Sequence, residues 1–125
     1  MDRILIVEDD RDHQRLLRDL LGDMGEVEIV AVSNTSEAEK ILESEVIDLI
    51  ILDHWMSDNT GGDWYLHYLH GHKEERIRKL PVLFVTILAM NPEIKRLARE
   101  KNVIVIPKPV EFRDLIFSAK KLLQR

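Results

Sequence analysis

Several polar side chains stand at the ends of apolar runs of strand length. They are Glu8, Asp9, Asp10, Asp53, Thr86 and Lys108. If these runs are neighbouring strands of one sheet, the carboxylates would repel each other by on the order of 4 kcal/mol per close pair at an effective dielectric of about 20. Protonation or a bound cation would relieve that repulsion. Oxygen ligands without histidine or cysteine suit Mg²⁺ or Mn²⁺, and a lysine would add further positive charge.

Each of these residues also has a purely structural explanation. Acidic residues after a strand commonly cap the next helix and favour its dipole, and a lone aspartate often starts a turn. Thr86 could be an ordinary strand residue, and Lys108 could belong to an ordinary loop. The combination favours a shared site, because the polar residues at all but one of the predicted strand ends complement each other chemically.

Runs of valine, isoleucine and leucine predict the strands that would position these residues. Four runs do not alternate with polar residues, which is typical of parallel strands covered on both faces. They cover residues 4–7, 48–52, 82–87 and 103–106. A fifth run at 27–32 is interrupted by Glu28 and suits an edge strand, although a loop would also fit.

Segments with helical periodicity lie between the runs. Apolar residues recur at three- and four-residue spacing around 16–21, 38–42, 94–98 and 112–123. Thr35 or Ser36 could cap the second helix, and Pro92 fits the first turn of the helix that contains 94–98. A further helix is expected at 63–70, although its apolar residues do not share one face.

Strand and helix therefore alternate five times along the chain. This pattern predicts right-handed βαβ crossovers and an α/β fold in which a parallel sheet lies between two layers of helices. The sequence contains no internal repeat, low-complexity stretch or linker. We therefore expect residues 1–125 to form a single domain.

Composition argues against several classes of function. The net charge is −5 and the basic residues form no block, so we expect no direct contact of this domain with nucleic acid. No apolar run approaches the roughly 20 residues that span a bilayer, and the sequence contains no cysteine for disulfide or thiol chemistry. The run at 4–7 is too short for a secretory signal, so a cytoplasmic location is expected.

Five short motifs occur in a characteristic order. They are ILIVEDD at 4–10, LIILDHWM at 49–56, Gly61, PVLFVT at 81–86 and PKP at 107–109. With these motifs the sequence resembles, over essentially its whole length, the receiver domains of bacterial two-component response regulators. The resemblance implies a flavodoxin-like, doubly wound (βα)5 fold with a five-stranded parallel sheet in the order 2-1-3-4-5.

The resemblance also implies a signalling phosphoacceptor and not a metabolic enzyme. Asp53 would accept a phosphoryl group from the phosphohistidine of a sensor histidine kinase or a phosphotransfer protein. Asp9, Asp53 and the backbone carbonyl of Trp55 would bind Mg²⁺ or Mn²⁺, and Glu8 would act through water. The domain would assist its own phosphorylation and dephosphorylation.

Further residues of the motifs would contact the phosphoryl group. By the resemblance, Thr86 would hydrogen-bond one phosphoryl oxygen and Lys108 would pair with another. The Lys108–Pro109 bond is expected to be cis, and Asp10 is expected to serve the first helix. The signal could pass to an attached effector domain, to a downstream protein or through a homodimer.

The sequence departs from the family pattern in four places. Ile87 stands where a small residue is usual, and we expect its bulk to slow both phosphorylation by small donors and hydrolysis. Val105 replaces the aromatic residue that often acts as a switch, so output would depend on the Thr86 loop and the following helix. Ser57 replaces the usual proline, and the segment 61–86 is slightly long.

Histidines make up part of the remaining sequence. A Zn²⁺ site built on His67, His70 and His72 is conceivable, but a solvated helix end is the favoured explanation. His54 is expected at the rim of the pocket together with Trp55. His13 is predicted to be a surface residue of the first helix.

Other functions compete with phosphorylation. A receiver fold could act as a phosphorylation-independent, protein-binding module, which the unusual Ile87 and Val105 would allow. An aspartate-nucleophile phosphohydrolase usually needs a second acid two residues after the nucleophile, and Trp55 occupies that place. Nucleotide binding is disfavoured because neither G-x-x-x-x-G-K-[ST] nor G-x-G-x-x-G occurs.

Overall fold

The computed structural model of the protein describes residues 1–56, 60–87 and 91–125. Five strands form one sheet in the order β2-β1-β3-β4-β5, and every neighbouring pair is parallel. The strands are β1 (Asp2–Val7), β2 (Val27–Val32), β3 (Leu49–Asp53), β4 (Val82–Thr86) and β5 (Val103–Pro107). The predicted α/β fold and its strand order are therefore confirmed.

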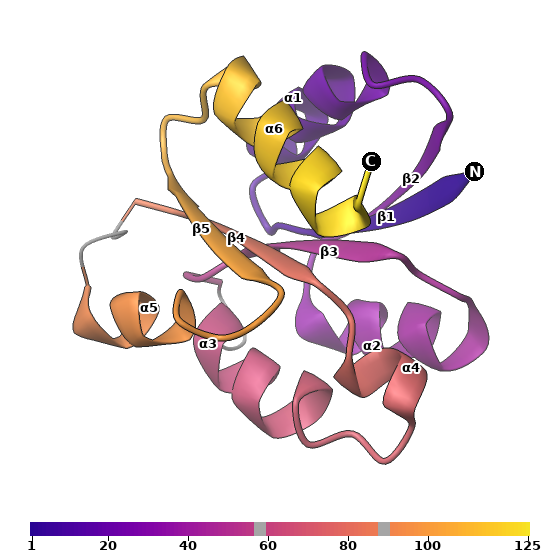
Figure 1. The fold of residues 1–125 in the computed structure, drawn as a ribbon, viewed down its shortest axis with the longest axis vertical. Coiled ribbons are helices and arrows are strands. Elements are labelled where there is room, and N and C mark those ends of the chain that lie inside the picture. The colour runs from indigo at the N-terminus through magenta and orange to yellow at the C-terminus, as the bar shows by residue number, and fades with distance from the viewer. Residues whose placement is uncertain (57–59, 88–90) are drawn as a thin grey trace.

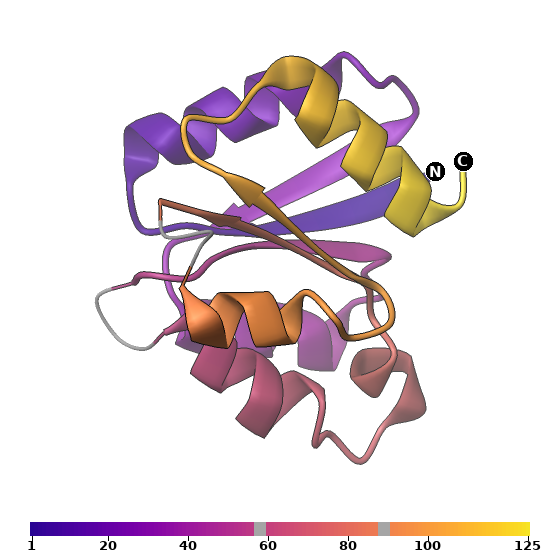
Figure 2. The ribbon, with the colours of Figure 1, turned by 60° about the vertical axis from the view of Figure 1, so that its left-hand side comes forward.

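Helices cover both faces of the sheet, as Figures 1 and 2 show. One face carries α1 (Arg11–Gly22) and α6 (Phe112–Leu123). The other carries α2 (Thr35–Ser44), α3 (Gly61–Trp64), the π-helix η1 (Tyr65–Leu69), α4 (Glu75–Arg78) and α5 (Pro92–Leu97). Across the described ranges, no helix has both the length and the apolar character needed to cross a membrane.

The continuous apolar runs explain why the sheet is buried on both sides. All residues of β4 and β3 are buried, and successive side chains point to opposite faces. In β1, for example, Leu5 and Val7 pack toward the α2–α5 layer, whereas Ile4 and Ile6 pack toward α1 and α6. Each fully buried aliphatic side chain contributes roughly 1.5–3 kcal/mol. The tightly packed core therefore fixes the positions of the strand ends.

Local capping differs from the sequence prediction at one helix and agrees at another. Thr35 and Ser36 were candidate caps of α2, but both are helical and Asn34 is the N-cap, whose side chain accepts a hydrogen bond from the Glu37 amide at 2.8 Å. The prediction for α2 is therefore wrong by one residue. Pro92 does begin α5, directly after the N-cap Asn91.

The irregular apolar pattern of the predicted helix at 63–70 has a physical explanation. After the four residues of α3, the backbone widens into η1, in which the His70 amide donates to the Tyr65 carbonyl five residues earlier at 2.8 Å. A π turn accommodates an extra residue and shifts the following side chains around the axis. For this reason the apolar residues of 63–70 do not form one stripe. The additional short helix α4 occupies more of the long segment.

Candidate functional site

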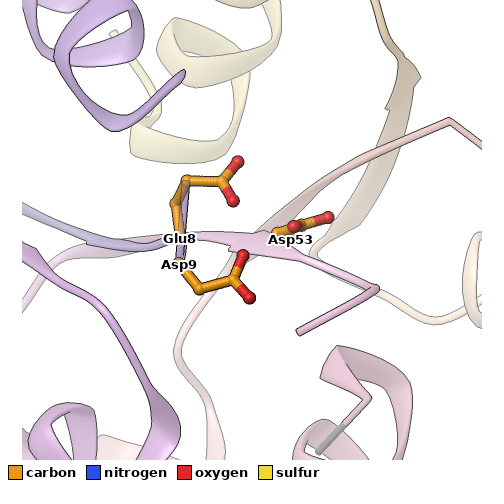
Figure 3. A group of neighbouring side chains, drawn as sticks. All are labelled: Glu8, Asp9 and Asp53. Atoms are coloured by element: carbon orange, nitrogen blue, oxygen red, sulfur yellow. The ribbon is translucent and has the colours of Figure 1, made fainter. Parts of the chain in front are cut away.

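Three carboxylates meet at the carboxyl ends of β1 and β3. Glu8 and Asp9 directly follow β1, and Asp53 is the last residue of β3. The two strands are neighbours, with Val7 paired to Leu52, so their ends lie side by side. One carboxylate oxygen from each of Glu8, Asp9 and Asp53 lies within 4.8 Å of the others. Figure 3 shows the side chains of Glu8 and Asp9 extending toward Asp53.

The donor set of this cluster fits a hard divalent cation. All three side chains offer oxygen, which suits Mg²⁺ or Mn²⁺ better than softer metals. Glu8 and Asp53 are 1% and 6% exposed, whereas Asp9 is exposed to solvent, so the cluster has one open side. Within the described ranges, this is the only group of three or more such side chains close enough to share a metal ion.

The histidines of the 61–81 segment are therefore not gathered into a metal site. His70 stacks on Tyr65 with ring centroids 5.6 Å apart. His72 lies 3.0 Å from Glu43 through its Nε2 atom and accepts from the Glu74 amide through Nδ1. These contacts are structural, as favoured over a zinc site, although the His72 side chain is only 9% exposed and so is not part of a solvated helix end.

Lys108 reaches the acidic cluster from the end of β5. Its Nζ atom lies 3.1 Å from Glu8 Oε1 and 3.6 Å from Asp53 Oδ2. Its backbone amide donates to the carbonyl of Thr86 at 2.9 Å, which ties the β5 end to β4. The Lys108–Pro109 bond is cis, as expected from the resemblance.

Thr86 and Trp55 complete the set of residues predicted from the sequence. Thr86 ends β4, is fully buried, and lies at the same edge because Asp53 pairs with Val85, the residue before it. The Trp55 amide donates to Asp53 Oδ1 at 3.3 Å, and the indole is 43% exposed beside the site. Metal binding by the Trp55 carbonyl stays a prediction.

Burial and mutual repulsion set the protonation of the two buried carboxyls. Burial, followed by the hydrogen bond and the negative charge of Glu8, raises the pKa of Asp53, and Lys108 offsets part of that rise. Burial would also raise the pKa of Glu8, but hydrogen bonds with His13 and Asp53 and the charge of Lys108 hold it well below its ordinary value. A cation would replace the proton that the pair otherwise tends to keep.

His13 belongs to the site, although the sequence predicted a surface position. Its side chain is only 16% exposed, and its Nδ1 atom lies 2.5 Å from Glu8 Oε1. Asp10 is the N-cap of α1, as expected, and accepts from the amides of Asp12 and His13. The missed signal was spacing, because His13 precedes the buried Leu17 by one helical turn and so lies on the inner face of α1.

His54 was predicted at the pocket rim, and this prediction is wrong. The side chain is fully buried, and its Nδ1 atom accepts from the Gly62 amide at 3.1 Å. Gly61 approaches the end of β3 so closely that a Cβ atom there would lie 2.4 Å from the Asp53 carbonyl. The glycine eight residues after Asp53 therefore fixes the backbone of the candidate phosphoacceptor.

The departures from the family pattern have different structural settings. Ile87 follows β4 and its side chain is 67% exposed beside the strand end. Val105 packs, partly buried, against the core cluster on the α5 side of the sheet. Ser57 lies outside the described residues.

Comparison with known proteins agrees with the fold. The chemotaxis protein CheY of Pseudomonas aeruginosa is 29% identical over 123 residues, which cover 98% of this chain and 97% of that protein. The receiver domain of a signal transduction histidine kinase from Syntrophus aciditrophicus is 30% identical, with a TM-score of 0.84 over 99% of this chain and 91% of that one.

A third relative shares the fold at lower identity. It is the receiver domain of the sensor histidine kinase PA1611 from Pseudomonas aeruginosa, solved with a magnesium ion in its active-site cleft. It is 20% identical, with a TM-score of 0.83 over 99% of this chain and 98% of that one. The sequence profile of the response regulator receiver domain matches residues 4–120. The chain therefore belongs to the receiver domain family of two-component signalling.

Proposed function

We propose that this receiver accepts a phosphoryl group on Asp53 in a reaction that depends on Mg²⁺ or Mn²⁺. The donor would be the phosphohistidine of a sensor kinase or of a phosphotransfer protein. The observation that supports this most directly is the grouping of the Glu8, Asp9 and Asp53 carboxylates within 4.8 Å, with the Lys108 ammonium 3.6 Å from Asp53.

The proposed transfer requires alignment and charge compensation more than covalent help from the protein. A carboxylate oxygen of Asp53 attacks phosphorus as the bond from phosphorus to the donor imidazole nitrogen breaks. The bonding electrons return to that nitrogen, and the product is an aspartyl phosphate. A bound divalent cation supplies charge compensation to the phosphoryl oxygens.

The residues of the chain have separate tasks in this proposal. Lys108 transfers its Nζ contact from the carboxylates to a phosphoryl oxygen, and the Thr86 hydroxyl donates to another. Asp53 must be ionised to attack, and the positive charge of Lys108 and of the cation favours that form. Asp53 is only 6% exposed, so the donor would approach it from the open side of the cluster.

Output from the phosphorylated domain would pass through the Thr86 loop and α5. Val105 packs against the core cluster and, as a valine, has no aromatic ring that could move between buried and exposed positions. A change at Thr86 would therefore reach partners through the backbone that leads into α5. The recipient would be an attached effector domain, a downstream protein or a second copy of the chain.

Incubation with acetyl phosphate and MgCl₂ tests the proposed function. We expect intact mass spectrometry to find one added phosphoryl group on the wild type, none on Asp53→Asn, and full labelling of Asp19→Asn, which removes an exposed carboxylate of α1. Beryllofluoride with MgCl₂ should change the fluorescence of Trp55, and Trp55→Phe identifies the reporting indole. A wild type that remains unlabelled and does not respond would favour the phosphorylation-independent module.

A further inference from the structure

We propose that His13 is a positioning residue that holds Glu8 in place when Lys108 leaves it for the phosphoryl group. This inference rests on the proposed function, because it concerns the lysine that would bind the phosphoryl oxygens. It assigns a task to a side chain of α1 that the motifs of the family do not include.

The starting observation is that two donors share one oxygen atom. Glu8 Oε1 lies 2.5 Å from His13 Nδ1 and 3.1 Å from Lys108 Nζ. The same ammonium is 3.6 Å from Asp53 Oδ2, so Lys108 lies nearer to Glu8 than to the phosphoacceptor. Lys108 must therefore weaken its contact with Glu8 to reach a phosphoryl oxygen on Asp53.

Departure of Lys108 would leave a buried carboxylate short of partners. Glu8 is 1% exposed, so bulk water has little access to the oxygen atom that loses its donor. Its other oxygen, Oε2, accepts from the Asp10 amide only at 3.3 Å. A buried charge that loses a partner incurs a desolvation penalty, and the hydrogen bond with His13 reduces that penalty.

His13 is well placed for this task because its own position does not depend on Lys108. Asp10 Oδ1 accepts from the His13 amide at 3.1 Å and fixes the first turn of α1. The side-chain Nε2 atom of Gln14 donates to the carbonyls of Glu8 and Val32 at 3.1 and 3.0 Å, which ties α1 to β1 and β2. The Nε2 atom of His13 is buried and makes no hydrogen bond within the described structure, so Glu8 is the polar contact that orients the ring.

Replacement of His13 should therefore affect the step in which Lys108 changes partners. Without the Nδ1 donor, Glu8 would depend on Lys108 and resist its release. A hydrogen bond to a charged group contributes about 1.5–3 kcal/mol, so we expect about 10-fold or greater loss of affinity for a phosphoryl analogue. Asparagine can place an amide N–H near the position of Nδ1 and should retain most of the affinity.

The test uses beryllofluoride titrations at saturating MgCl₂, followed by tryptophan fluorescence. We expect His13→Leu to weaken beryllofluoride binding at least about 10-fold and His13→Asn to remain close to the wild type. His67→Leu changes an exposed histidine of η1 on the opposite face of the sheet and serves as the matched control. Circular dichroism melting of each variant identifies any general loss of folding.

A double-mutant cycle with Lys108→Met separates positioning from structural damage. If His13 acts by freeing Lys108, His13→Leu should have little further effect in the Lys108→Met background. Equal losses in both backgrounds, or no loss for His13→Leu in an otherwise responsive protein, would overturn the inference. A wild type that binds no beryllofluoride and takes no label from acetyl phosphate would instead refute the proposed function, and the role of His13 with it.

Discussion

Replacement of Asp53 by asparagine is expected to stabilise the metal-free protein at alkaline pH. Asp53 is 6% exposed, and one of its oxygens lies within 4.8 Å of oxygens from Glu8 and Asp9. Burial, then the hydrogen bond and charge of Glu8, raises the pKa of Asp53 from 3.8 to about 7. Ionisation is therefore less favourable in the folded protein than in the unfolded chain, and the neutral amide of asparagine avoids that penalty.

The sign and the size of the effect follow from this pKa. A carboxyl group whose pKa is raised by folding stabilises the fold most below its unfolded value of 3.8, and that contribution is lost as the pH rises through about 7. A rise of about three pKa units sets a ceiling of about 4 kcal/mol. Water that reaches the exposed Asp9 screens part of this energy, so we expect a gain of about 1–3 kcal/mol at alkaline pH.

Urea unfolding at about pH 5 and about pH 8.5 measures the difference directly. In EDTA, Asp53→Asn should be more stable than the wild type at the higher pH. The difference in the free energy of unfolding between the two proteins should be smaller at the lower pH. MgCl₂ should stabilise the wild type and narrow the gap, and Asp19→Asn should follow the wild type throughout. The reasoning is refuted if Asp53→Asn has no advantage at high pH in EDTA, or if its advantage is independent of pH.

Two further substitutions test the surroundings of Asp53. Gly61→Ala would place a Cβ atom 2.4 Å from the Asp53 carbonyl oxygen, so we expect urea unfolding to show a loss of about 1–3 kcal/mol in the free energy of unfolding. The control Gly22→Ala meets no atom within 4 Å and should not lower that free energy. Equal effects of the two substitutions would contradict the steric argument. Ile87→Ala removes an exposed bulky side chain at the end of β4. It should speed both the labelling of Asp53 by acetyl phosphate and the loss of the phosphoryl group. An unchanged lifetime of the aspartyl phosphate would show that Ile87 does not restrict access to the site.

The sequence predicted the strands well because burial on both faces leaves a strong local pattern. Even the run at 27–32, in which Glu28 is exposed, forms β2 at the sheet edge with intermediate burial, as an edge strand should. The π turn of η1 was not predicted, because helical periodicity assumes 3.6 residues per turn and a π turn breaks that rule. Tertiary contacts, not local propensity, decide such a segment.

Site residues were predicted where a strand end identifies them and misplaced where a tertiary contact decides their position. Asp53 and Lys108 follow apolar runs, so topology alone brings them to one edge of the sheet. His13 and His54 could not be placed in this way. The role of His13 depends on a side-chain contact with Glu8 across the β1–α1 connection, and the burial of His54 depends on the close approach of Gly62.

Unequal burial allows the same three carboxylates to perform different tasks. Glu8 is almost fully buried, and its Oε1 atom already accepts from His13 and Lys108, so direct binding to a cation would disrupt buried hydrogen bonds. Asp9 is exposed and would meet an incoming hydrated ion first. This difference favours direct coordination by Asp9 and Asp53, with Glu8 acting through a water molecule. Because Glu8 would then retain its protein donors, one of them, Lys108, could be released to the phosphoryl group in the proposed reaction while the other keeps the carboxylate in place.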